Sequence, residues 1–207
     1  MYFKKYREWF ALFTLTSLWA TGLMLMVFAT PAQAWGIHHH RFFSSGLETH
    51  TARYAATGSV ETAYSPDEGA EYLVIKAIRS AQHEIDIMAY GFSNPKITEA
   101  LLQALSRHVQ VYMAVDAKAN TVEDRSGKAQ SALNALRQAG AAIHLVHAYA
   151  IAHDKVMIID QQTVETGSFN YTEAAAHRNS ENVVVLWNNP AVALDYRHHF
   201  ARNWSAP

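Results

Sequence analysis

His153-Asp154-Lys155, then Asp160, then Gly167-Ser168-Phe169-Asn170 form the stretch of this 207-residue chain that decides its fold and chemistry. Written as a pattern, the stretch reads H-x-K, four residues, D, six residues, G-S-x-N. It places an imidazole, a fixed cation and small polar donors within a segment the length of a hairpin. These are the groups needed to hold a phosphodiester and attack its phosphorus. The pattern occurs once in the chain.

The apolar run after the motif predicts a buried strand over 155–159. Residues two apart on a strand face the same side, so His153 and Lys155 are expected to project together. An imidazole beside an ammonium is harder to protonate, which favours a neutral, nucleophilic His153. Lys155 would stabilise a non-bridging phosphate oxygen. Taken alone, the two residues would be interpreted as surface polar residues at the end of a strand, and it is the G-S-x-N motif at the right distance that favours the catalytic interpretation.

The second half of the motif supplies small groups around this pair. Gly167 would let the backbone approach an anion closely, and Ser168 and Asn170 would donate hydrogen bonds to it. Asp160 is an odd number of residues from Lys155 and is expected to anchor the hairpin. Glu181 begins a later apolar strand and could accept a hydrogen bond from an imidazole N–H. An ordinary turn and a solvated strand-end glutamate are the alternatives for these groups.

Metal catalysis is the weaker alternative chemistry. His144 and His147 are close to the motif, but they are three residues apart on a predicted strand and its end, so they diverge. Two-metal phosphodiesterases need several converging carboxylates, and Lys155 would repel a cation. We therefore expect no metal ligands in this site.

Composition favours one globular domain with a sizeable core. Half of the residues are hydrophobic, and there is no cysteine, which excludes disulfides, cysteine-ligated zinc and a thiol nucleophile. The formal net charge is −1, and residues 1–34 carry three basic residues and one acidic one. The remainder is therefore mildly acidic, so any polyanion must be met by a local basic patch.

Residues 1–34 resemble a secretory signal peptide. Lys4, Lys5 and Arg7 precede an apolar run over 9–28, and Ala32-Gln33-Ala34 is a cleavage site of small residues. We expect cleavage before Trp35 and a periplasmic or secreted protein without stable membrane association. The alternative is an uncleaved anchor, because the run is about the ~20 residues that span a bilayer.

Residues 35–59 are expected to be a flexible linker, and 60–207 a single α/β domain. Strands and helices alternate early, which predicts a mixed, largely parallel sheet with helices on both faces and antiparallel late strands. We predict strands over 60–65, 85–90, 109–115, 143–146, 155–159, 163–166 and 183–187. We predict helices over 66–80, from Asn94-Pro95 onward, and over 126–139 and 190–204.

Segments of residues 60–204 resemble the single-motif bacterial endonucleases of the phospholipase D superfamily. The resemblance rests on the H-x-K and G-S-x-N motifs, Glu61–Asp67, Met88–Ser93 and Val164–Asn170. It implies catalysis without metal or cofactor through a phosphohistidine, with His153, Lys155 and Glu181 catalytic and Asp160 structural. Two H-x-K motifs form one site in that superfamily, so the resemblance also implies a homodimer.

Substrate choice is predicted from a loop and two aromatic residues. Lys118, Arg125 and Lys128 lie on the loop after the strand over 109–115 and could follow a nucleic-acid backbone, while Tyr90 or Phe92 could stack a base. We therefore expect a nuclease acting on DNA or RNA. A phospholipase, which would need an apolar funnel, and a non-catalytic polyanion-binding protein are the alternatives.

Overall fold

The computed structural model describes residues 51–207. Their element order is β1 (Ser59–Ser65), α1 (Ala70–Ser80), β2 (Glu84–Ala89), α2 (Pro95–Ser106), β3 (Gln110–Asp116), α3 (Lys128–Gln138), β4 (Ala142–Val146), β5 (Lys155–Ile159), β6 (Thr163–Gly167), α4 (Glu173–His177), β7 (Glu181–Trp187) and α5 (Pro190–Ser205). The predicted signal peptide, and residues 35–50 of the predicted linker, lie outside the described residues. Among residues 51–207, no helix has the length and apolar character needed to cross a bilayer.

The strands form one mixed sheet in the order β1-β7-β6-β5-β2-β3-β4. The pairs β2–β3 and β3–β4 are parallel, and the other four pairs are antiparallel. The predicted α/β class and mixed sheet are confirmed, but the parallel part is smaller than expected. The reason is that β5, β6 and β7 lie between β1 and β2, so β1 pairs with β7 rather than with β2.

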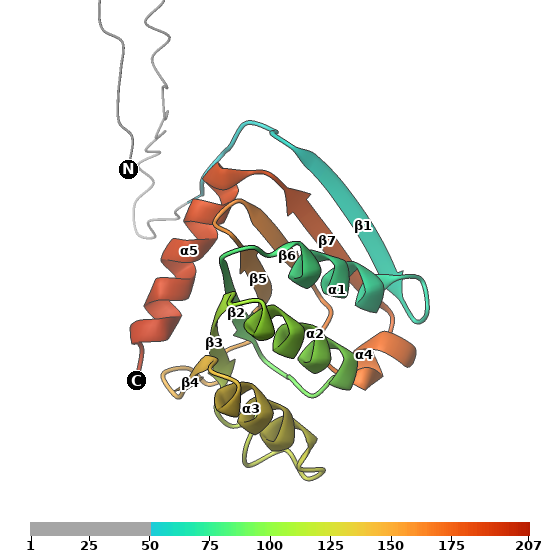
Figure 1. The fold of residues 1–207 in the computed structure, drawn as a ribbon, viewed down its shortest axis with the longest axis vertical. Helices are drawn as coiled ribbons and strands as arrows, with labels where there is room; N and C mark the ends of the chain where they lie inside the picture. The colour runs from blue at the N-terminus through green and yellow to red at the C-terminus, as the bar shows by residue number, and fades with distance from the viewer. Residues whose placement is uncertain (1–50) are drawn as a thin grey trace, which may run out of the picture. The chain divides into compact units, whose positions relative to one another are not determined.

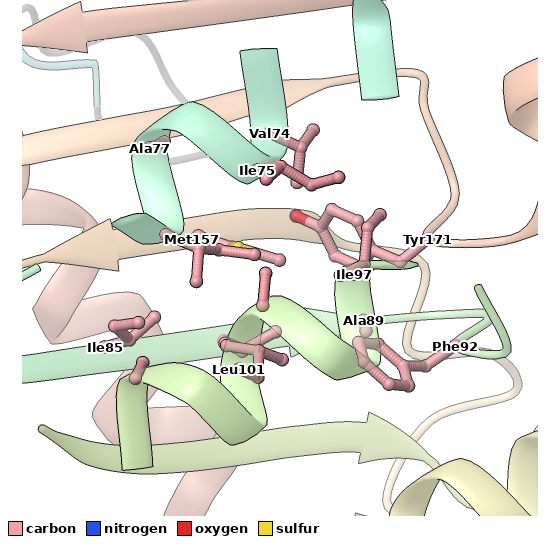
Figure 2. Packing of buried hydrophobic residues seen from close by; sticks show 14 of the residues in the cluster. Val74, Ile75, Ala77, Ile85, Ala89, Phe92, Ile97, Leu101, Met157 and Tyr171 are labelled. Atoms are coloured by element: carbon pink, nitrogen blue, oxygen red, sulfur yellow. The ribbon is translucent and has the colours of Figure 1, made fainter. Parts of the chain in front are cut away.

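One face of the sheet carries the larger core. The helices α1, α2, α3 and α4 pack their apolar side chains on it, and Figure 1 shows α1 and α2 side by side over the sheet. In Figure 2, Met157 of β5 is drawn between Ala77 of α1 and Leu101 of α2, while Ile75 of α1 and Ile97 of α2 are drawn beside the ring of Tyr171. Full burial of such side chains contributes roughly 1.5–3 kcal/mol each.

The opposite face is covered by α5, so helices lie on both faces, as predicted. Phe200 of α5 belongs to the second core together with Val156 and Ile158 of β5. The rings of Phe200 and Trp204 are stacked with centroids 5.6 Å apart. The strand β5 is therefore buried on both sides, which matches its uninterrupted apolar sequence.

Two helices begin later than the sequence predicted. The helix α1 starts at Ala70 rather than Pro66, because Asp67 (φ 58°) and Gly69 (φ 91°) adopt left-handed backbone conformations. Likewise α3 starts at Lys128, after Gly127 with φ 70°. The predicted cap of α2 is present: Asn94 Oδ1 accepts hydrogen bonds from the backbone N–H groups of the next turn. The short helix α4 was not predicted.

The hairpin that joins β5 to β6 is fixed by Asp160. Its carboxylate accepts hydrogen bonds of 2.8, 2.8 and 2.9 Å from the backbone N–H groups of Gln82, His83 and Glu84. Its own φ of 50° is left-handed. Asp160 therefore ties the hairpin to the start of β2, at the opposite end of β5 from the H-x-K motif.

Candidate active site

The two halves of the motif meet where several central strands of the sheet end. The carboxyl ends of β2 and β6 and the amino ends of β5 and β7 lie there, because these neighbouring strands run in alternating directions. A pocket of about 440 Å³ opens at these strand ends. It is lined by His153, Lys155, Gly167, Ser168, Asn170 and Glu181. The structure thus brings these six predicted residues together.

The His153 side chain is exposed. A neighbouring aromatic ring and hydrogen bonds of the flanking residues fix its position. Its ring lies against the ring of Tyr90, with centroids 4.7 Å apart and planes tilted by 54°. The preceding residue, Ala152, donates its backbone N–H to Asp116 Oδ2 at 2.7 Å. The main-chain oxygen of the following residue, Asp154, accepts the backbone N–H of Tyr90 at 2.9 Å. The imidazole is therefore accessible while its backbone is held on both sides.

Lys155 is only 7% exposed. Its Nζ donates to the main-chain oxygen of His153 at 2.9 Å and lies 5.4 Å from the centre of the Tyr90 ring. Burial lowers the pKa of Lys155, and the charges of Asp154 and Glu181 oppose this effect. A cation that has lost much of its water interacts more strongly with a phosphate oxygen than a solvated one does.

Ser168 and Glu181 form a hydrogen-bonded unit. The Ser168 hydroxyl donates to Glu181 Oε2 and accepts the backbone N–H of Asn182 at 3.1 Å. Glu181 Oε1 accepts from Asn179 Nδ2 at 2.9 Å. The predicted roles therefore change: the hydroxyl proton of Ser168 points to Glu181 rather than into the pocket. The carboxylate oxygens are bonded to Ser168 and Asn179 rather than to His153 of the same chain.

Gly167 is required by a neighbouring strand. A Cβ atom at this position would lie 2.1 Å from the main-chain oxygen of Asn182, on the paired strand β7. This close approach explains why a glycine is needed here. Gly167 also lines the pocket, and its contact with an anion stays a prediction. The Asn170 side chain lines the pocket, and its Oδ1 is buried with no hydrogen-bond partner. An amide oxygen only accepts, so the group of Asn170 that could donate to a phosphate oxygen is its Nδ2.

Of the residues predicted to bind nucleic acid, Tyr90 lies beside His153, and the others lie outside the pocket. Lys118 and Arg125 do not line the pocket, and Lys118 Nζ is paired with Glu123 at 3.0 Å. Lys128 Nζ is paired with Glu173 at 2.8 Å. Phe92 is fully buried and packs edge-on against Tyr171, so it cannot stack a base. The two lysines thus form ion pairs on the surface, and Phe92 belongs to the core.

Asp116 and Asn120 support the site and were not identified from the sequence. Asp116 ends β3 and holds Ala152, as described above. Asn120, which is fully buried, accepts the backbone N–H of Phe92 at 2.9 Å and donates to the main-chain oxygen of Tyr90 at 2.6 Å. The one sequence signal is a polar side chain directly after an apolar strand, which in open α/β sheets marks the edge where ligands bind.

The donor set of the described region does not fit a metal centre. Within residues 51–207, no group of three or more histidine, cysteine, aspartate or glutamate side chains is placed to hold a metal ion. The pocket itself combines one carboxylate, one imidazole and one buried ammonium. Its charged chemistry therefore rests on Lys155, His153 and Glu181.

Known proteins are similar to this chain in sequence and in structure. Residues 74–204 match the family described as cardiolipin synthase, PLD-like domain. A protein named phospholipase D from Rickettsia bellii is 40% identical over 129 residues, which cover 61% of this chain and 60% of the relative. A phospholipase D from Rickettsia typhi is 35% identical over 149 residues, covering 71% and 69% of the two chains.

A solved structure is similar over the same region. The crystal structure of Nuc from Salmonella typhimurium, described as a phospholipase D family member, has a TM-score of 0.68 and 42% sequence identity. The alignment covers 70% of this chain and 93% of Nuc. The residues that match the family make up more than half of the chain and include the H-x-K and G-S-x-N motifs. Residues of both motifs line one pocket. The chain therefore belongs to the phospholipase D superfamily, as a protein with a single H-x-K motif.

Proposed function

We propose that this phospholipase D-like protein hydrolyses phosphodiester bonds of nucleic acid, DNA or RNA, without a metal ion. The proposal is carried by one arrangement: the exposed imidazole of His153 lies beside the buried ammonium of Lys155 in an open pocket. The imidazole supplies a nucleophile and the ammonium supplies fixed positive charge. Together they replace the two functions that a metal ion serves in other phosphodiesterases.

The reaction proceeds in two displacements. The neutral imidazole of His153 attacks phosphorus, and the P–O bond to the leaving group breaks as a protonated histidine gives that oxygen its proton. The second histidine, now neutral, takes a proton from water, whose oxygen attacks the phosphohistidine. The P–N bond breaks and releases a phosphate monoester. Lys155 and Asn170 hold the non-bridging oxygens throughout.

This scheme needs two histidines on opposite sides of phosphorus, because displacement is in line. The chain has one H-x-K motif, so we propose a two-fold homodimer in which each subunit contributes His153 to a shared site. The pocket lies at the ends of the central strands and opens to the surface. His153 is exposed there and is accessible to a second subunit, which supports this arrangement.

Nucleic acid is the preferred substrate because the pocket lining contains no apolar side chain. A phospholipase needs apolar surface for acyl chains. The similarity to Nuc, which extends over 93% of that protein, also supports the endonuclease group that the sequence resembles. Phospholipid headgroups are the second candidate, favoured by the exposed Tyr149 and Ile151 on the loop before His153 and by the names of the Rickettsia relatives.

One incubation separates the candidates. Purified protein is incubated with plasmid DNA, RNA or phosphatidylcholine vesicles, each with and without excess EDTA, and the His153→Ala variant is the control. We expect nicking of the plasmid or shortening of the RNA by wild-type protein alone. Choline release without nucleic-acid cleavage would reassign the substrate to lipid. Activity that EDTA abolishes and Mg²⁺ or Zn²⁺ restores would overturn the metal-free mechanism.

We also propose that the protein is exported to the periplasm or secreted, with a mature terminus at Trp35. The support is the sequence of residues 1–34, with its basic start, apolar run and small-residue site. N-terminal sequencing of protein from the producing cell tests this. An intact first residue on membrane-bound protein would favour the anchor instead.

A further inference from the structure

Asp154, the central residue of the H-x-K motif, contacts the opposite side of the sheet from its two neighbours. Its Oδ2 lies 3.2 Å from Nε2 of His199 and 3.5 Å from Nδ2 of Asn203, both on α5. The pocket side chains His153 and Lys155 make neither contact. The motif is thus the place where the C-terminal helix touches the candidate active site.

The hydrogen bonds around His199 indicate its tautomer. Nη2 of Arg202 lies 2.9 Å from Nδ1 of His199. A guanidinium group can only donate, so Nδ1 must accept and the ring proton is on Nε2. That proton points to Asp154, and the series of donors runs from Arg202 through His199 to the carboxylate. Each hydrogen bond in the series orients the next.

Asn203 reinforces the same contact from inside the protein. It is 2% exposed, and its Nδ2 lies 3.3 Å from the sulfur of Met88 on β2. The amide group is therefore held between β2 and Asp154. Because Met88 and Ala89 of β2 pair with Val156 and Lys155, this places Asn203 at the start of the motif strand.

The contact has two consequences for the pocket. The main-chain oxygen of Asp154 already accepts the N–H of Tyr90, so fixing the Asp154 side chain restrains the peptide groups that join Asp154 to His153 and to Lys155. The carboxylate of Asp154 also attracts the charge of Lys155. Donors from α5 compete for that carboxylate and keep it turned away from the pocket, which leaves the ammonium available to phosphate.

We propose that His199 and Asn203 are positioning residues of the active site, which act through Asp154 to fix the orientation of His153 and Lys155. This inference rests on the proposed function, because it assigns α5 a part in phosphodiester hydrolysis. Small displacements of a catalytic group have large effects, and an error of about 1 Å can reduce turnover about 100-fold.

The test uses His199, because it is partly exposed and its removal leaves no buried polar group in the core. We expect His199→Ala to lower kcat about tenfold with KM changed less than about twofold, since substrate contacts remain. His199→Gln, whose amide can donate to Asp154, should recover most of the loss. The matched control is His198→Ala, the preceding, exposed residue of the same helix, which should behave as wild type.

Coupling gives a second criterion. If His199 acts through Asp154, the effects of Asp154→Ala and His199→Ala on kcat should not add. The double variant should then have the kcat of the less active single variant. Additive effects, a change confined to KM, or equal losses in His198→Ala and His199→Ala would each overturn the proposal.

A third readout needs no substrate. Long-range ¹H–¹⁵N correlation spectra of the imidazoles report the surroundings of His153 directly. We expect its resonances to shift in His199→Ala and return toward wild type in His199→Gln, but to stay in place in His198→Ala. If wild-type protein cleaves no phosphodiester, the proposed function fails while these spectra still decide the positioning. Unchanged His153 resonances in His199→Ala would overturn it.

Discussion

The Tyr171 hydroxyl donates a hydrogen bond of 2.7 Å to Oε2 of Glu165, and both side chains are fully buried. These two residues bracket the segment 166–170, which carries Ser168 and Asn170 of the pocket. Tyr171 also joins this segment to the loop after β2, because its main-chain oxygen accepts the N–H groups of Ser93 and Asn94 at 2.8 and 2.9 Å. The pair thus holds together two of the segments that form the site.

Glu165 should make the stability of the fold depend on pH. Burial raises its pKa from 4.5 to about 8, and its hydrogen bond from Tyr171 opposes this only in part. Its contribution is fully present below pH 4.5, where the unfolded chain is also protonated. It is lost as pH rises to about 8, because unfolding then frees a carboxylate, with a slope of roughly 1 kcal/mol per pH unit.

The measurement is the free energy of unfolding by urea between pH 5 and pH 9, for wild type and Glu165→Gln. Glutamine keeps the acceptor for Tyr171 and cannot ionise. We expect the difference between the two proteins to change across this range, with the variant gaining relative stability as pH rises. Two parallel curves would show that Glu165 does not titrate in this window.

Replacing Gly167 should lower the stability of the sheet as well as affect the active site. In Gly167→Ala the new methyl group would meet the main-chain oxygen of Asn182 at 2.1 Å, so β6 and β7 must separate. We expect a loss of roughly 1–3 kcal/mol in the free energy of unfolding. Gly91→Ala is the control, since its Cβ would come no closer than 3.4 Å to Thr172. Equal losses in both variants would contradict this explanation.

Asp160 should matter for stability and not for turnover. Asp160→Ala removes an acceptor from three backbone N–H groups and leaves alanine with a left-handed backbone. We expect the free energy of unfolding to fall by about 3 kcal/mol. Below the melting temperature kcat should stay within about twofold of wild type, because Asp160 is at the far end of β5. A large fall in kcat of folded protein would mean that the strand transmits the change.

A shared site predicts a specific response to mixed subunits. When wild-type protein exchanges with excess His153→Ala protein, only wild-type homodimers hold both histidines, so activity should fall as the square of the wild-type fraction. A linear fall, with exchange verified by mass spectrometry, would show that one histidine suffices. Wild-type activity should also follow a bell-shaped pH curve, because one histidine must be neutral and the other protonated.

The sequence located the pocket well because the spacing of the motif is a local property. Side-chain alternation places His153 and Lys155 together, and the length of one hairpin brings Gly167 and Ser168 back beside them. The same reasoning assigned the β5–β6 hairpin and the cap of α2. Left-handed residues such as Asp67 were not recognised, so the start of α1 was misplaced.

Long-range relationships were missed for a physical reason. Nothing near Asp116 in the sequence indicates that it binds Ala152, and nothing near His199 indicates that it meets Asp154. The order of the strands is also a global property, since alternating strands and helices do not reveal that a later hairpin lies between β1 and β2. Ser168 and Gly167 were located correctly, but their contacts depend on Asn182 of β7.

The motif strand β5 has three strands on each side of it in the sheet. Amide protons at the edges, on β1 and β4, can exchange with solvent after local fraying, whereas those of β5 require both halves of the sheet to separate. We therefore expect the slowest hydrogen–deuterium exchange in the protein at residues 155–159. As a heated sample approaches its melting temperature, the periphery should open while the strand that carries Lys155 keeps its shape, so the scaffold of the pocket should persist until the fold as a whole is lost.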